Sequence, residues 1–142
     1  MNQISICLLL LGSTTLNCYS QEETEFHIDM EVTMVSSGQI SPSKKITFEN
    51  CVFDLVLNQQ NDTVYLQTRD ASFKTLEGYH VGTDWNSIHN EHRSNLEKMP
   101  GWGYYIELDS GWNLGFCEGQ SCTDSAPTQG SVVKWIFRRN NY

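Results

Sequence analysis

The chain has 142 residues, a length that suggests one domain with a sizeable hydrophobic core. Its 17 acidic residues outnumber its 9 basic residues and give a formal net charge of −8. Because a negatively charged surface repels the phosphate backbone, this balance argues against nucleic-acid binding.

The beginning of the chain has the pattern of a secretory signal peptide. The first twenty residues contain no Asp, Glu, Lys or Arg, and Ile4–Leu11 is a short apolar run. A membrane-spanning helix would need roughly 20 apolar residues. Small residues at Cys18 and Ser20 favour cleavage before Gln21. We therefore expect a signal peptide over residues 1–20 and a single mature domain over residues 21–142, secreted or periplasmic and without a transmembrane segment.

The alternative is a lipoprotein with a lipid anchor on Cys18. The residues before this cysteine depart from the usual lipobox, because Thr15 stands where Leu is preferred and Asn17 stands where a small residue is preferred. Lipidation would make the protein membrane-anchored without changing its fold.

Three cysteines remain after the expected cleavage: Cys51, Cys117 and Cys122. Cys117 and Cys122 are separated by four residues that include Gly119, so we predict a disulfide between them in an oxidising compartment. Cys51 is left over, either buried in a strand or paired in some other way.

The first part of the mature chain reads as strands. Apolar and polar residues alternate over Phe26–Met34, which predicts a strand. Ser36–Lys45 is rich in Ser and contains Gly and Pro, which predicts a loop. Ile46–Asn58 is predicted as the next strand. A turn at Gln59–Asp62 and a returning strand at Thr63–Asp70 then complete a hairpin.

Residues 84–98 are predicted to form a helix in the middle of the domain. Thr83 can cap its N-terminus, and Asp84 suits the positive end of the helix dipole. Pro100 and Gly101 end the pattern. The apolar stripe, at steps of three and four residues, consists of Trp85, Ile88, His92, Leu96 and Met99.

A second hairpin and a closing strand follow the predicted helix. Tyr104–Leu108 alternates, Asp109–Gly111 forms a turn, and Trp112–Phe116 returns. Val132–Arg139 is predicted as the last strand, after a loop. Strands on both sides of one helix predict an α+β fold, an antiparallel β-sheet with one central helix over residues 84–98 packed on one face.

The stretch FKTLEGYHVGTDWNSI, residues 73–88, resembles a unit found in small exported bacterial domains of the β-lactamase-inhibitor-protein and outer-membrane assembly lipoprotein type. With the later hairpin and closing strand, the resemblance covers about residues 73–137. Those units usually carry an acidic or valine-rich helix, where this chain has DWNSI. The resemblance implies protein–protein binding in the cell envelope without catalysis, and it identifies no binding residue here.

The aromatic residues are the strongest candidates for binding. Trp85 and Trp135 are expected in the core. Four aromatic residues lie around one hairpin, where alternation turns some of them away from the core, and flat exposed rings bind protein partners or stack on sugars. We predict that the protein is a non-catalytic module that binds a protein partner, or alternatively a carbohydrate, through Trp102, Tyr104, Tyr105 and Trp112.

Catalytic and metal-binding patterns are weaker. His89 and His92 would share one face of the predicted helix, but no spaced third ligand accompanies them, so we expect neither a metal site nor a cofactor. A small hydrolase using carboxylates such as Asp84 and Glu107 is the least favoured alternative, because the sequence does not show two carboxylates held across a cleft. No catalytic residue is assigned.

Overall fold

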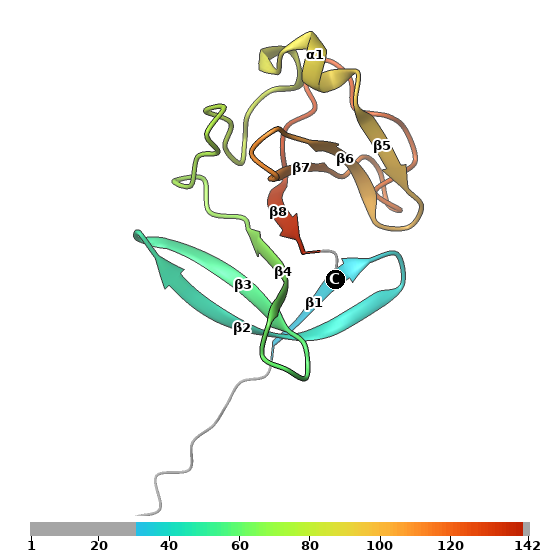
Figure 1. The fold of residues 1–142 in the computed structure, drawn as a ribbon. Coiled ribbons are helices and arrows are strands. Elements are labelled where there is room, and N and C mark those ends of the chain that lie inside the picture. Colours follow the sequence, from blue (N-terminus) through green and yellow to red (C-terminus); the bar gives the residue numbers. More distant parts are fainter. Residues whose placement is uncertain (1–30, 141–142) are drawn as a thin grey trace, which may run out of the picture.

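The protein is an antiparallel β-sheet structure in the computed structural model, which describes residues 31–140 (Figure 1). The predicted signal peptide, Cys18 and the first part of the strand predicted at Phe26–Met34 lie outside the described residues. Within them, two short helices are present, the 3-10 helix η1 (Trp85–Ser87) and α1 (Asn90–Arg93). The strands are β1 (Glu31–Ser36), β2 (Gln39–Phe48), β3 (Cys51–Leu57), β4 (Thr63–Thr68), β5 (Leu96–Met99), β6 (Gly103–Glu107), β7 (Asn113–Phe116) and β8 (Trp135–Arg139).

The eight strands form one sheet in the order β1-β2-β3-β4-β8-β7-β6-β5. In Figure 1, β1–β4 lie in the lower half of the molecule, β5–β7 lie in the upper half below α1, and β8 lies between the two groups. The last strand of the sequence therefore joins the first four strands to the other three, through pairing with β4 and β7.

The predicted α+β fold with a helix over residues 84–98 is wrong. The only helical parts of this segment are η1, where Asp84 rather than Thr83 is the cap, and the single turn α1. Ile88 has an extended backbone (φ −83°, ψ 133°), and Leu96–Met99 pairs with β6 instead of continuing a helix. No helix among residues 31–140 is long and apolar enough to span a membrane.

Low helix propensity explains this difference. The segment between Trp85 and Leu96 is rich in Asn and Ser, whose side chains compete with the helical backbone for hydrogen bonds. The apolar spacing was correct as a sign of burial, since Ile88 is 1% exposed, but a chain of loops and single turns achieves that burial here.

The region between β1 and β3 also differs from the sequence prediction. Most of the predicted loop at Ser36–Lys45 belongs to β2, and the predicted strand at Ile46–Asn58 is divided by a tight turn. Glu49 and Asn50 have positive φ angles of 49° and 64°, the backbone of a two-residue hairpin turn. The hairpins β3–β4 and β6–β7 are confirmed.

β8 is buried on both of its faces. Trp135 and Phe137 pack on one face with Val56, Tyr65 and Trp102. Ile136 points to the opposite face and joins a second cluster, which is covered by the loops and short helices that follow β4. The expected core position of Trp135 is confirmed, since this side chain is 7% exposed.

Side chains from β8 and from the turn between β5 and β6 reach back to the edge strand β1. Trp102 Nε1 donates a hydrogen bond to the Met34 carbonyl (3.1 Å), and Arg139 Nη2 donates to the Val35 carbonyl (2.9 Å). The sheet is therefore curled, and we call the face that carries Trp135 and Phe137, toward which β1 bends, the inner face. The other face of the sheet is called the outer face.

Candidate functional site

Trp102, the first of the four predicted binding aromatics, is a core residue in this fold. It is 5% exposed, and its ring meets Trp135 and Phe137 edge-on at centroid distances of 5.1 and 4.9 Å. The Arg139 guanidinium lies 4.7 Å from the ring centroid, within the range of a cation–π contact. The ring is therefore not available as a flat exposed platform.

The other three predicted aromatics are half-buried and divided between the two faces of the sheet. Tyr105 packs with the inner cluster, whereas Tyr104 and Trp112 pack with the outer cluster. Burial, together with a hydrogen bond to Glu97, raises the pKa of Tyr105 to about 12. Because alternating residues of a strand face opposite sides, this hairpin does not gather the four rings into one surface.

The predicted disulfide between Cys117 and Cys122 is confirmed. Cys51 is buried and unpaired among the described cysteines, and its sulfur lies 3.5 Å from the Ser72 hydroxyl. The disulfide ties together the loop after β7, next to the inner cluster.

Asp84 and two of the histidines, His80 and His89, line a separate cavity of about 450 Å³, whereas His92 is not among its lining residues. Asp84 accepts the Asn86 amide as the cap of η1, and the Tyr79 hydroxyl lies 2.9 Å from His92 Nδ1. Among residues 31–140 no group of three or more potential metal ligands occurs. Glu107 is exposed on β6.

A polar pocket of about 510 Å³ opens on the inner face of β1–β4. β1 contributes Glu31 and Thr33, and β2 contributes Lys45. The floor comes from Val52 and Asp54 of β3 and from Gln67 of β4, and the residues after β4 complete the wall. We call this site the polar pocket, and its lining residues are Glu31, Val32, Thr33, Met34, Lys45, Val52, Asp54, Gln67, Arg69 and Asp70.

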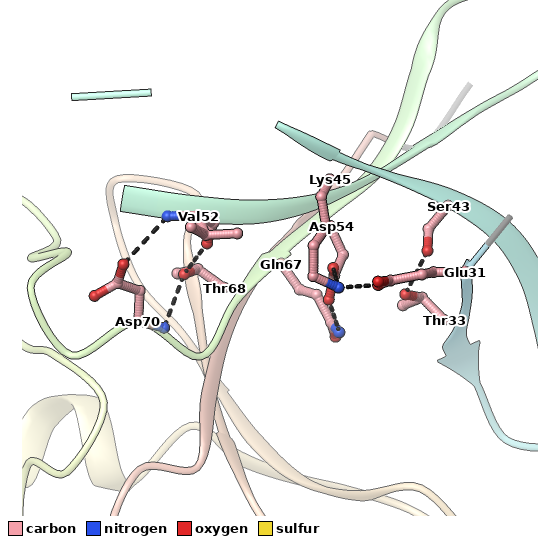
Figure 2. A network of polar contacts seen from close by, with 9 residues as sticks. All are labelled: Glu31, Thr33, Ser43, Lys45, Val52, Asp54, Gln67, Thr68 and Asp70. Carbon is pink, nitrogen blue, oxygen red and sulfur yellow. Dashed lines mark hydrogen bonds and ion pairs between the residues drawn. The ribbon is translucent and has the colours of Figure 1, made fainter. Parts of the chain in front are cut away.

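A chain of polar contacts crosses the polar pocket (Figure 2). Lys45 pairs with Glu31 and lies 3.5 Å from Asp54. The other carboxylate oxygen of Asp54 accepts from Gln67 Nε2 (3.0 Å), and Gln67 Oε1 accepts from the Tyr65 hydroxyl (3.0 Å). Burial raises the pKa of Tyr65, so this hydroxyl stays protonated and holds the Gln67 amide in one orientation.

The wall beyond β4 is fixed by Asp70. Its carboxylate accepts from the Val52 amide (3.2 Å) and from the amide and hydroxyl of Ser72 (3.0 and 2.5 Å). The hydroxyl of Ser72 is the main cause that holds the pKa of Asp70 below its usual range. Figure 2 shows Asp70 beside Val52, at one end of β3, and Lys45 with Glu31 farther along the strands. The pocket is therefore bordered by charged groups on both sides.

The outer face of the first hairpin is apolar and exposed. Val32, Met34 and Ile40 are 67%, 44% and 61% exposed. The register places Val32 opposite Pro42 and Met34 opposite Ile40, so these side chains adjoin one another. Phe48, at the end of the same row on β2, is 62% exposed. We call this surface the apolar face, and it consists of Val32, Met34, Ile40, Pro42 and Phe48.

Sequence reasoning missed both the polar pocket and the apolar face. Each depends on β2, most of which lies in the segment predicted as a loop. The alternation of Ile40, Pro42 and Lys44 with Ser41 and Ser43 was the available signal, and Ser and Pro content concealed it.

No family model matches the chain, and no curated protein matches it. Among solved structures, the chain is similar to the uncharacterized protein yfeY from Escherichia coli, with 15% sequence identity and a TM-score of 0.43. The match covers 69% of this chain and 80% of that chain. A likeness at this level supports no functional assignment, and the helix implied by the resemblance to β-lactamase-inhibitor-type units is absent.

Proposed function

We propose that the protein is a non-catalytic, extracytoplasmic module that binds a protein partner on the apolar face. The observation that carries the proposal is the contiguity of Val32, Met34 and Ile40, large side chains that are largely exposed and adjacent through the β1–β2 register. Contiguous exposed apolar patches rimmed by polar residues are typical of interaction surfaces, whereas isolated exposed apolar residues are ordinary.

The energetics favour this surface over the predicted hairpin. Full burial of a Val, Ile or Met side chain contributes about 1.5–3 kcal/mol. The exposed side chains of the apolar face still have most of that burial to gain, while Trp102 is already buried in the fold. A partner on the apolar face therefore gains more than a partner on the hairpin around Trp102.

The charge distribution indicates what kind of partner fits. The outward positions of β2 are Ile40, Pro42, Lys44, Ile46 and Phe48, so Lys44 is their one charged residue. The chain as a whole carries a net charge of −8, yet this row holds a lysine and no carboxylate. The complementary partner offers an apolar docking surface bordered by acidic side chains.

The disulfide supports an extracytoplasmic location, because such bonds persist in oxidising compartments. A signal peptide over residues 1–20, with secretion or periplasmic export, remains part of the proposal. Lipidation of Cys18 is its alternative, in which the same domain is anchored to a membrane.

Site-specific photocrosslinking tests the proposal. A photoreactive residue at position 40 should capture one protein from the host envelope or culture fluid, identified by mass spectrometry. The same residue at position 76 is the matched control, because Leu76 is an apolar side chain 92% exposed outside the apolar face. Binding of the purified partner should weaken roughly tenfold or more in the double variant Met34→Ser, Ile40→Ser and remain unchanged in Leu76→Ser.

Three outcomes would contradict this function. Equal capture from positions 40 and 76 would mean that the apolar face is not selective. Capture of a second copy of this chain, with concentration-dependent dimers in solution, would make the face a self-association surface. Retained affinity in a folded double variant would place the partner elsewhere, and the glycan reading of the hairpin aromatics would then be tested with Trp112→Ala.

A further inference from the structure

The geometry points to the polar pocket as a second binding site, for a small molecule that carries a carboxylate beside hydroxyl or ammonium donors. The polar side chains of the site lie on the inner face of β1–β4, whereas the proposed partner surface lies on the outer face. Val32 and Met34 of the edge strand β1 border both. Its volume of about 510 Å³ falls in the range of small-ligand sites.

The carboxylates that line the polar pocket are already supplied with donors. Glu31 pairs with Lys45, Asp54 accepts from Gln67, and Asp70 is held by the amides of Val52 and Ser72. These contacts fix the side chains before any ligand enters, and such preorganisation lowers the entropic cost of binding. The groups that remain for a ligand are therefore few and identifiable.

Arg69 is the cation of the pocket that is left for a ligand. Lys45 is occupied by two carboxylates, but within residues 31–140 Arg69 makes no hydrogen bond or ion pair with another side chain or the backbone. Its side chain is exposed and lines the pocket. A guanidinium offers several N–H donors in a planar fork that matches the two oxygens of a carboxylate.

The rest of the pocket selects for donors on the same ligand. A carboxylate oxygen accepts more than one hydrogen bond, so Asp54 and Glu31 retain lone pairs beyond those used by Gln67 and Lys45. Hydroxyl or ammonium groups satisfy those lone pairs. Val52, which is 40% exposed, adds an apolar patch to the floor for a carbon skeleton.

Other ligand classes fit less well. A phosphate, with close to two negative charges, would be repelled by Glu31, Asp54 and Asp70, whereas a carboxylate brings a single charge to Arg69. A metal ion would need several converging ligands, and no group of three or more potential ligands is found in the described part of the chain. A neutral sugar would leave the Arg69 guanidinium without an anionic partner.

Two sources of this ligand chemistry are distinguished by matched probes. D-glucuronate is compared with D-glucose, which keeps the hydroxyl groups and lacks the carboxylate. Glycylglycine is compared with its C-terminal amide, which keeps the ammonium group and lacks the carboxylate. Binding is measured on the full mature domain by calorimetry and by the shifts of the backbone amide signals of Val52, Gln67 and Arg69.

At least one of the two carboxylates should bind at millimolar concentrations, and its analogue without the carboxylate should bind roughly tenfold more weakly or not at all. Arg69→Gln should weaken binding by roughly tenfold or more, and Arg69→Lys should restore part of the affinity. Lys74→Gln is the matched control, since Lys74 is exposed and lies outside the pocket. A thermal unfolding curve of each variant verifies that the fold is intact.

Failure of both carboxylates to bind would overturn the inference. So would equal binding of the analogues that lack the carboxylate, or full affinity in Arg69→Gln. Selective binding of glucuronate would support a sugar acid as the ligand, and selective binding of glycylglycine would support an amino-acid or peptide terminus. The probes and the Arg69 variants leave every side chain of the apolar face unchanged, so this inference and the proposed function fail separately.

Discussion

Replacement of Trp102 by Ala tests the way the sheet is closed. The ring is 5% exposed, packs edge-on against Trp135 and Phe137, and donates a hydrogen bond to the Met34 carbonyl of β1. Loss of a buried Trp or Phe side chain costs about 3–5 kcal/mol. Loss of the hydrogen bond adds about 1 kcal/mol. Domains of this size have total stabilities of about 5–15 kcal/mol, so Trp102→Ala should bring the fold close to unfolding.

Urea unfolding of the wild type, Trp102→Ala and Trp102→Phe separates the two contributions. The phenylalanine keeps most of the apolar ring and loses the hydrogen bond to Met34. Trp102→Phe should therefore lower the free energy of unfolding by about 1 kcal/mol, compared with about 4 kcal/mol for Trp102→Ala. Hydrogen exchange of the β1 amides should accelerate in both variants. Leu76→Ala, at a side chain 92% exposed, should leave the stability unchanged.

The opposite result would restore the binding role predicted from the sequence. If Trp102→Ala unfolds at the same urea concentration as the wild type, with unchanged β1 exchange, the ring does not hold the sheet together. If that stable variant has also lost its partner, Trp102 is a binding residue and the assignment of the partner to the apolar face is wrong.

Three further predictions follow from single features of the fold. The Cys117–Cys122 disulfide has a sequence separation of 5, and closing so short a loop is worth about 2 kcal/mol by chain entropy, so the Cys117→Ser, Cys122→Ser double variant should lose about that much in urea unfolding. Gly115→Ala would place a Cβ atom against the Trp135 indole and should cost about 1–3 kcal/mol, measured in the same way. The pKa of Tyr105 is raised to about 12 by burial and a neighbouring carboxylate, so its neutral hydroxyl stabilises the fold fully below pH 10 and progressively less as the pH rises toward 12. Tyr105→Phe should therefore show a smaller alkaline loss of stability than the wild type, measured at about pH 9 and about pH 11.

Local patterns predicted the hairpins well. β6 and β7 alternate clearly, and Gly111 in the turn between them has a φ of 77°, a conformation that favours glycine. The Cys117–Cys122 bridge also followed from spacing alone. In these elements the determining contacts lie within a few residues of one another, so a reading of the sequence reaches them.

The predicted helix failed because its signal was ambiguous. Steps of three and four residues place Ile88, Leu96 and Met99 in apolar surroundings, but the same spacing is met by a 3-10 turn followed by an edge strand. Pairing of Leu96 with Ile106 and of Met99 with Gly103 decides between them, and that pairing partner lies outside the window of any helical pattern.

The polar pocket was beyond local reasoning for a related reason. Glu31, Lys45, Asp54 and Gln67 are spread over four strands, and they meet only through the registers of β1–β2, β2–β3 and β3–β4. In the sequence each of them is an ordinary polar residue of a strand or loop. Their proximity is a property of the sheet.

Both proposed surfaces depend on which face of the sheet each side chain of the β1–β2 hairpin points to. The pairing of Glu31 with Ser43 and of Val32 with Pro42 places odd-numbered side chains on the inner face and even-numbered ones on the outer face, although Val32 and Met34 also border the pocket at the edge of the sheet. A slip of one residue would reverse these faces and bury Val32 and Met34 beside Asp54. The buried hydrogen bond between Thr33 and Ser43 (3.0 Å) and the ion pair between Lys45 and Glu31 oppose that slip, because each would be broken by it. The polar contacts of the pocket thus also keep the apolar residues exposed. A substitution that removes the Lys45 charge should therefore disturb both surfaces, whereas a substitution of Ile40 should disturb only the apolar face.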